Sequence, residues 1–157
     1  MTIVGLTHVN INCSDYSRSL KFYELLGFEE FWDVPSTNTP EIAAAVGMPP
    51  YRVNGALLRL ASDAGGGQPL TIDLLQWIEP HDDEPPYRHL YHYGIARIAL
   101  TTTDLDADVA KLTAAGVSFI SDPVELPSGS GSSVRFVCFT DPDGTVLELV
   151  ENAISRP

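Results

Sequence analysis

Apolar and polar residues alternate in several short runs along the chain, and each such run predicts a strand. Two other segments carry apolar residues at helical spacing, begin at a serine or aspartate that can cap a helix, and end at a glycine. A short third helix is expected between Thr39, which can cap it, and Gly47, with Pro40 in the first turn. The predicted strands are Val4–Asn12, Phe28–Val34, Arg52–Ala61, Leu70–Ile78, Gly94–Thr102, Val117–Ile120, Val134–Thr140 and Thr145–Glu151, and the two longer helices run from Ser14 or Asp15 to Gly27 and from Asp104 to Ala115.

The order of these elements occurs twice. Gly5–Asp15 aligns without a gap with Gly94–Asp104, an offset of 89 positions, and Thr71–Gln76 aligns with Val146–Glu151 at an offset of 75. Each half therefore reads as a βαβββ module, and a duplicated module predicts two similar halves with function in the cleft between them. We expect an α+β fold in which the two modules form curved, mostly antiparallel sheets around one cavity.

Prolines and charged residues gather between the two halves, from Glu79 to Tyr91, and predict a linker without regular structure. Glycine- and serine-rich stretches predict flexible loops within each half. We therefore expect one domain, residues 1–157. It consists of module one (3–79), the linker (80–92) and module two (93–152), with loops at 63–68 and 128–133.

Composition is that of a globular chain of one domain. The 157 residues, 44% of them hydrophobic, are enough to bury a core. The sequence has no long apolar run and no signal peptide pattern at its start, so we expect a cytoplasmic protein that does not bind membranes. A net charge of −12 argues against nucleic acid as a partner, because phosphates would be repelled, and it permits a cationic ligand. Cys13 and Cys138 are not spaced like a metal-binding pair and are interpreted as small buried residues.

The repeat brings four polar residues into correspondence, His8 with Arg97 and Asp73 with Glu148. Each lies within an apolar strand, where a carboxylate facing the core is costly unless it is paired or ligates something. If both modules curl into half-barrels, the four residues converge on one cavity, and they are our candidate catalytic residues. Two other interpretations stay open: His8 as a hydrogen-bonded core histidine, and the two carboxylates as structural partners of Arg97.

Three segments, Gly5–Phe28, Gly94–Ala99 and Asp141–Val150, resemble the vicinal oxygen chelate superfamily. That superfamily includes glyoxalase I, methylmalonyl-CoA epimerase, extradiol dioxygenases, fosfomycin-resistance enzymes and bleomycin-resistance proteins. The resemblance covers nearly the whole chain and implies a glyoxalase-like fold, a small-molecule ligand and a homodimer. One scaffold serves isomerases, lyases, oxygenases and non-enzymatic binders, so the fold does not name the reaction.

The same resemblance implies a metal site whose ligands would fall at His8, Asp73, Arg97 and Glu148. Arg97 stands where the metalloenzymes usually have histidine, and a guanidinium has no lone pair to donate. At about 4 Å and an effective dielectric of about 20, its charge would oppose a cation by ~4 kcal/mol, roughly three decades of affinity. We therefore expect no cofactor. A divalent metal held by His8, Asp73 and Glu148, with Arg97 turned away, is the alternative.

Two functions remain open. In the first, the protein is an isomerase, lyase or cyclase acting on a small carbonyl or enol compound, with Arg97 stabilising negative charge and His8 or Glu148 as the base. In the second, it sequesters a drug or natural product, as bleomycin-resistance relatives do. The enzyme predicts an unpaired inward carboxylate or histidine, whereas the binder predicts that the four charges neutralise one another. The candidate ligand contacts are Arg97, Asn10, Tyr91 and Trp77.

Overall fold

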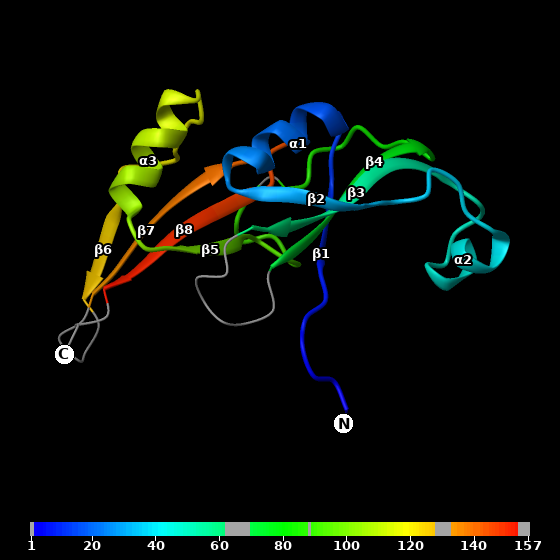
Figure 1. The fold of residues 1–157 in the computed structure, drawn as a ribbon, viewed down its shortest axis with the longest axis horizontal. Helices are drawn as coiled ribbons and strands as arrows, with labels where there is room; N and C mark the ends of the chain where they lie inside the picture. The colour runs from blue at the N-terminus through cyan, green and yellow to red at the C-terminus, as the bar shows by residue number, and fades with distance from the viewer. Residues whose placement is uncertain (1, 62–69, 88, 128–132, 154–157) are drawn as a thin grey trace. The chain divides into compact units, whose positions relative to one another are not determined.

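A computed structural model describes residues 2–61, 70–87, 89–127 and 133–153. They form two compact units that divide between Glu84 and Pro85. The predicted loop at 63–68 lies outside the described residues, as does all but the last residue of the loop at 128–133. The first unit contains β1 (Val9–Asn12), α1 (Tyr16–Leu25), β2 (Phe28–Asp33), α2 (Pro40–Ala45), β3 (Arg52–Leu60) and β4 (Thr71–Glu79), and the second contains β5 (Ile98–Thr102), α3 (Leu105–Ala114), β6 (Val124–Pro127), β7 (Ser133–Thr140) and β8 (Val146–Ala153) (Figure 1).

Each unit is built on a four-stranded mixed sheet, and the two sheets share one topology. The strand orders are β1-β4-β3-β2 and β5-β8-β7-β6. The β1–β4 and β5–β8 pairs are parallel, and the remaining pairs are antiparallel. The predicted α+β fold of two βαβββ modules with mostly antiparallel sheets is therefore confirmed, with α2 inserted in the first. The single cavity between the modules stays a prediction.

The duplication extends to the hydrogen-bonding register of the sheets. In the first sheet Asn10 of β1 is the partner of Asp73 of β4, and in the second Ala99 of β5 is the partner of Glu148 of β8. These are the residues that the offsets of 89 and 75 align. On the far side of each carboxylate, the partner is Leu57 in the first sheet and Cys138 in the second. Asp73 and Glu148 therefore occupy equivalent positions in three dimensions.

One face of each sheet packs against a helix of its own unit, and the other carries the aligned carboxylate. In the first unit the rings of Tyr23 on α1 and Phe28 on β2 meet edge to face at 5.9 Å. Side chains alternate across a strand, so neighbouring positions point to opposite faces. We call the second face the carboxylate face; it comprises Asn10, Asn12, Trp32, Leu57, Asp73, Leu75 and Trp77 in the first unit and Arg97, Ala99, Phe136, Cys138, Glu148 and Val150 in the second.

Both long helices begin and end as predicted. Asp15 and Asp104 are the caps, and each side chain accepts a 3.0 Å hydrogen bond from the backbone N–H three residues further on. The glycines that follow, Gly27 and Gly116, have φ of 91° and 90°, a conformation that strains other residues. Among the described residues, no helix is long and apolar enough to cross a membrane.

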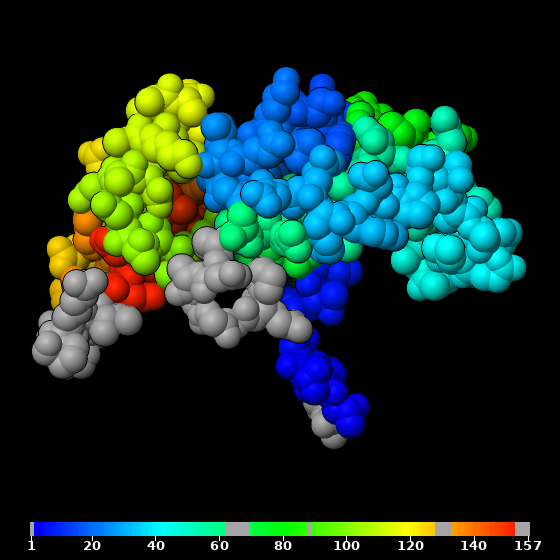
Figure 2. Space-filling view, viewed as in Figure 1, coloured from blue at the N-terminus to red at the C-terminus, as the bar shows by residue number. Residues whose placement is uncertain are grey.

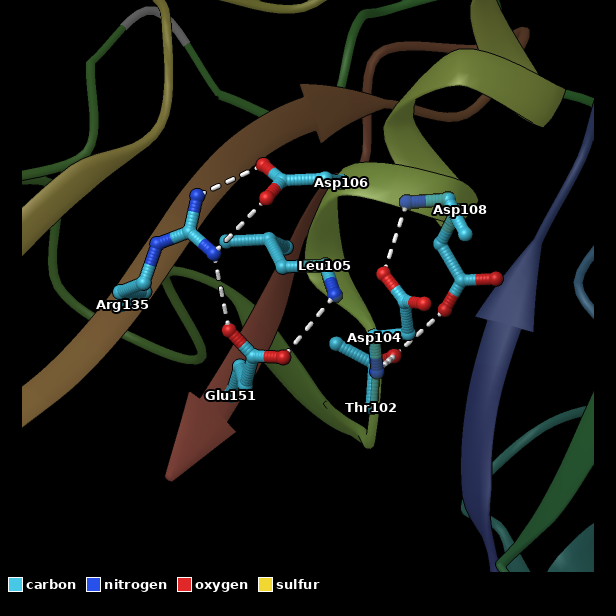
Figure 3. A network of polar contacts seen from close by, with 8 residues as sticks. Thr102, Asp104, Leu105, Asp106, Asp108, Arg135 and Glu151 are labelled. Carbon is cyan, nitrogen blue, oxygen red and sulfur yellow. Dashed lines mark hydrogen bonds and ion pairs between the residues drawn. The ribbon is translucent and has the colours of Figure 1, made fainter. Parts of the chain in front are cut away.

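The last strand of each unit also holds the first turn of the helix. Gln76 Oε1 accepts a 3.3 Å hydrogen bond from the backbone N–H of Tyr16, and Glu151 Oε1 accepts one of the same length from Leu105. Glu151 is charged where Gln76 is neutral, and its other oxygen accepts a 3.1 Å hydrogen bond from Arg135. Arg135 also donates to Asp106 on α3, so one guanidinium joins strand and helix (Figure 3).

We expect Glu151→Ala to destabilise the protein by about 1–2 kcal/mol, because the Leu105 N–H and Arg135 both lose an acceptor. Glu151→Gln restores the arrangement of the first unit and keeps the acceptor at Oε1, so its cost should stay below about 1 kcal/mol. Urea unfolding of the two variants measures both values. Equal losses would show that the ion pair with Arg135, rather than the helix cap, carries the stabilisation.

The first strand of each unit starts later than predicted. The prediction of Val4–Asn12 is wrong at its start, because β1 begins at Val9, and Gly94–Thr102 is wrong in the same way, because β5 begins at Ile98. A strand needs a hydrogen-bonded neighbour, and both begin where the parallel partner begins, Val9 beside Ile72 and Ile98 beside Leu147. The chain ahead of β1 is extended and exposed, and its dark blue atoms stand clear of the first sheet (Figure 2).

The strand predicted at Val117–Ile120 is also wrong. Phe119 forms only an isolated bridge with Phe139, and the edge strand beside β7 is instead β6, Val124–Pro127. Both segments follow the same edge of β7, but Ser121-Asp-Pro123 separates them, and proline lacks the N–H that a ladder requires. Alternation of apolar residues alone does not reveal which part of such an edge is paired.

Candidate functional site

The carboxylate face of the second unit carries an ion pair between Arg97 Nε and Glu148 Oε2. Arg97 lies directly ahead of β5, and Glu148 is in β8, the parallel neighbour of β5. The Glu148 side chain is 10% exposed and that of Arg97 is 48% exposed. A fixed positive charge therefore lies at the surface, with its buried counter-charge behind it.

The pairing engages only part of the Arg97 guanidinium. A guanidinium has five N–H donors, and the contact with Glu148 is made by Nε. In the described part of the chain, no hydrogen bond is formed by either terminal nitrogen of Arg97, and Glu148 is the one ion-pair partner of this side chain. The terminal nitrogens of Arg97 can therefore donate hydrogen bonds to an anionic oxygen of a ligand while Nε contacts Glu148.

Small side chains flank Glu148 on both neighbouring strands. Ala99 is its partner on β5 and Cys138 its partner on β7. Burial raises the pKa of the Cys138 thiol, the Glu148 carboxylate raises it further, and the Arg97 guanidinium acts in the opposite sense. The thiol is therefore kept protonated, which favours a packing role over a nucleophilic one.

The first unit has the matching arrangement with a different charge pattern. Asp73 is half-buried in β4, and Asn10 Nδ2 donates a 3.0 Å hydrogen bond to its backbone oxygen. Burial raises the pKa of Asp73, while the charge of His8 and the Asn10 side chain lower it. His8 is exposed and forms no ion pair with Asp73 within the described residues. Asp73 is thus an inward carboxylate without a fixed cation.

Asp73 and Glu148 share one further property. Among the described residues, the buried side-chain atoms that lack a hydrogen-bond partner are Asp73 Oδ1 and Glu148 Oε2. Glu148 Oε2 contacts Arg97 as an ion pair, but the contact lacks the angles of a hydrogen bond. Buried acceptors are nearly always satisfied, and exceptions concentrate where a protein uses them. Two such atoms at duplicated positions keep these carboxylates as candidate functional residues.

We expect Asp73→Asn to raise the free energy of unfolding by about 1 kcal/mol at neutral pH, because it removes an unsatisfied buried charge. The raised pKa means that the folded protein holds this proton more tightly than the unfolded chain. The penalty of the charged form is therefore present above the folded-state pKa and disappears as the pH falls to the ordinary carboxyl range. Urea unfolding at several pH values measures this gain. Asp33→Asn, which neutralises an exposed carboxylate on β2, is the control, and a loss of stability in Asp73→Asn at neutral pH would contradict the interpretation.

The predicted ligand contacts are distributed over different parts of the chain. Asn10 and Trp77 are on the carboxylate face of the first unit, where Trp77 Nε1 donates a 2.9 Å hydrogen bond to Asn12. Tyr91 is 82% exposed in the segment ahead of β5, and its ring stacks on His89 at 4.6 Å. The ligand-binding roles of all three stay predictions.

The sequence did not show the positions of two further residues on these faces. Cys138 was interpreted as a small buried residue, yet it is half-buried beside Glu148, and Trp32 is 51% exposed on β2, beside Leu57. Both positions follow from the register of β3 and β7 with the strands beside them. The duplication did not reveal that register, because it shows no alignment between β3 and β7.

The residues do not fit the divalent metal that the family resemblance implies. Arg97 has no lone pair to give, and its Nε already contacts the Glu148 oxygen that would face an ion. Within the described residues, no group of three or more His, Cys, Asp or Glu side chains is placed to hold a metal ion. The positive charge of Arg97 already balances the negative charge of Glu148. A protein isolated without tightly bound metal stays our prediction.

Comparison with known proteins gives a family match over most of the chain. The model of the Glyoxalase/Bleomycin resistance protein/Dioxygenase superfamily matches residues 5–149. The uncharacterized protein YwkD of Bacillus subtilis (strain 168) is 26% identical over 152 residues, which are 96% of this chain and 99% of that protein.

Solved structures show the same fold at low sequence identity. A glyoxalase family protein from Bacillus cereus is similar with a TM-score of 0.77 at 18% identity, covering 98% of this chain and 97% of that one. The genomically encoded fosfomycin resistance protein FosX from Listeria monocytogenes is similar with a TM-score of 0.59 at 19% identity, covering 96% of this chain and 94% of that one. These similarities concern the fold alone.

Proposed function

The chain belongs to the Glyoxalase/Bleomycin resistance protein/Dioxygenase superfamily, and we propose that it acts on a small carbonyl or enol compound with Arg97 as the electrophile in place of a metal. The observation that carries this proposal is the Arg97–Glu148 pair, in which a buried carboxylate holds a guanidinium whose terminal nitrogens form no hydrogen bond within the described residues. A preorganised donor of this kind stabilises an oxygen on which negative charge develops.

Glu148 positions Arg97 in this proposal and does not move the proton. Its carboxylate is engaged by the guanidinium, whereas Asp73 has no cation partner of this kind among the described residues. Asp73, with His8 as its electrostatic neighbour, is the candidate acid or base of the first unit. A raised pKa brings a carboxylate closer to the range in which a general acid or base works best.

The elementary step is an enolisation. A base takes the proton from the carbon next to a carbonyl, the electrons of that C–H bond form the enol double bond, and those of the C=O double bond move onto oxygen. Arg97 receives the resulting oxyanion. Return of the proton to the same or another carbon gives an epimerase or isomerase, and loss of a group from the enolate gives a lyase.

The second candidate is a non-enzymatic protein that sequesters a small molecule. It is favoured by the partial neutralisation of the inward charges, because Arg97 and Glu148 already pair. Exposed aromatic residues would then make most of the ligand contacts. The homodimer and the cytoplasmic location stay predictions under both candidates.

Proton exchange separates the two candidates. Pyruvate and phenylpyruvate are incubated with the protein in D2O containing a chelator, and NMR follows the loss of the protons next to the carbonyl. The enzyme predicts exchange faster than with heat-denatured protein, and a loss of that acceleration in Arg97→Ala. Saturable binding without exchange would favour the sequestering protein.

A further inference from the structure

The carboxylate face of the first unit carries a row of four side chains that runs straight across the sheet. Asn10 is the partner of Asp73, Asp73 of Leu57, and Leu57 of Trp32. Partners in register point to the same face, and neighbouring strands lie about 4.8 Å apart, so the row is about 14 Å long. Its first half is polar and its second half is apolar.

The polar half contains a carboxylate whose hydrogen-bonding capacity is not filled. One N–H of the Asn10 amide donates to the backbone oxygen of Asp73, and the Asp73 side chain is half-buried, with its enclosed Oδ1 lacking a partner within the described residues. Two residues further along β1, the side-chain oxygen of Asn12 already accepts a hydrogen bond from Trp77. A molecule that lies along this row must therefore bring a donor to Asp73, while an anionic group there would meet a carboxylate.

In the apolar half, no aromatic ring among the described residues covers the Trp32 indole. Trp32 is 51% exposed, and its ring stacks on no other ring among the described residues. The other tryptophan is held differently, because Trp77 donates to Asn12 and contacts the Tyr51 ring at 4.9 Å. Leu57 lies between Trp32 and Asp73 and continues the apolar surface up to the carboxylate. A flat ring placed on Trp32 and Leu57 would bring a donor on its edge to Asp73.

From this row we infer that the first unit binds a planar ring compound carrying an N–H or O–H donor, with the donor on Asp73 and the ring against Trp32. The inference rests on the proposed function in that it names a class of compound held at Asp73, the candidate acid or base of the first unit. It does not involve Arg97, so a failure here leaves the oxyanion proposal standing.

Intrinsic fluorescence tests the inference, because both tryptophans of the chain lie on this face. The reporter is Trp77→Phe, in which Trp32 is the remaining tryptophan. Three probes of one size are titrated: benzamide, which has N–H donors; methyl benzoate, which has none; and benzoate, which is anionic. We expect benzamide to change the Trp32 emission, and the ester and the anion to bind roughly tenfold more weakly or less, because each lacks the hydrogen bond to a charged acceptor.

Variants in the same reporter background locate the donor contact. Asp73→Asn should weaken benzamide binding by roughly tenfold, whereas Asp33→Asn, which removes an exposed carboxylate from the same unit, should leave it unchanged. Equal binding of amide and ester, or full binding in Asp73→Asn, would overturn the inference. A Trp32 emission that changes with protein concentration but does not respond to benzamide would also overturn the inference. In that case a second copy of the chain would occupy this face.

Discussion

Replacing Arg97 by lysine should weaken the binding of 2-oxo acids and slow their proton exchange nearly as much as replacing it by alanine. Lysine keeps the positive charge but lacks the planar set of N–H donors of a guanidinium. It therefore cannot contact Glu148 through one edge of the group and a ligand oxygen through another. Removing one oxyanion donor typically costs on the order of 10²–10³ in rate, and we expect losses of that size in both variants. Isothermal titration and exchange rates in the presence of a chelator measure the two effects.

The ion pair between Arg52 and Glu79 provides a matched control. It is also formed between an arginine Nε and a glutamate oxygen, at 3.3 Å, but both side chains are exposed. Arg52→Lys and Arg52→Ala should therefore leave binding and exchange unchanged. If Arg97→Lys and Arg97→Ala both behave like the parent protein, Arg97 is only a structural partner of Glu148.

The second large effect is a gain of metal affinity. Arg97→His supplies a ligand and removes the charge that opposes a cation, which at about 4 Å is worth ~4 kcal/mol, or roughly three decades of affinity. It also frees the Glu148 oxygen that Arg97 contacts. We expect Zn²⁺ or Ni²⁺ to bind this variant far more tightly than the parent protein, as measured by calorimetry and by elemental analysis after dialysis.

Two results would contradict this expectation. Near-stoichiometric zinc, nickel, iron or manganese in the parent protein after native purification would show that Arg97 does not replace the metal. Binding by Arg97→His no tighter than that of Arg52→His, an added histidine at an exposed position, would show that Glu148 is not placed to hold a metal together with a histidine at position 97.

The internal repeat made most of the fold predictable. Alignment of Gly5–Asp15 with Gly94–Asp104 placed the first strand and helix of each unit, and the aspartate caps and terminal glycines were read correctly because these preferences are local. The starts of β1 and β5 were predicted too early because they depend on where β4 and β8 begin, which is a tertiary property. The edge beside β7 was misplaced for the same reason.

The candidate site was predictable in its members but not in its pairing. Alternation singled out His8, Asp73, Arg97 and Glu148. The two carboxylates lie in strands at equivalent positions, whereas His8 and Arg97 lie directly ahead of β1 and β5. Nothing in the sequence determines that Arg97 contacts Glu148, since Asp73 has the same chemistry. The contribution of Trp32 was hidden because it depends on the register of β2 with β3, including an irregularity between Glu30 and Trp32.

The most direct test of the central claim is whether a ligand oxygen reaches Arg97 without a metal. In protein labelled with ¹⁵N-arginine and kept in a chelator, the Arg97 Nε–H resonance is assigned by its loss in Arg97→Lys and followed during titration with pyruvate. We expect a saturable shift of the Arg97 resonance while that of Arg52 stays in place. A resonance that does not move while pyruvate binds, or binding that appears only when a divalent metal replaces the chelator, would contradict it.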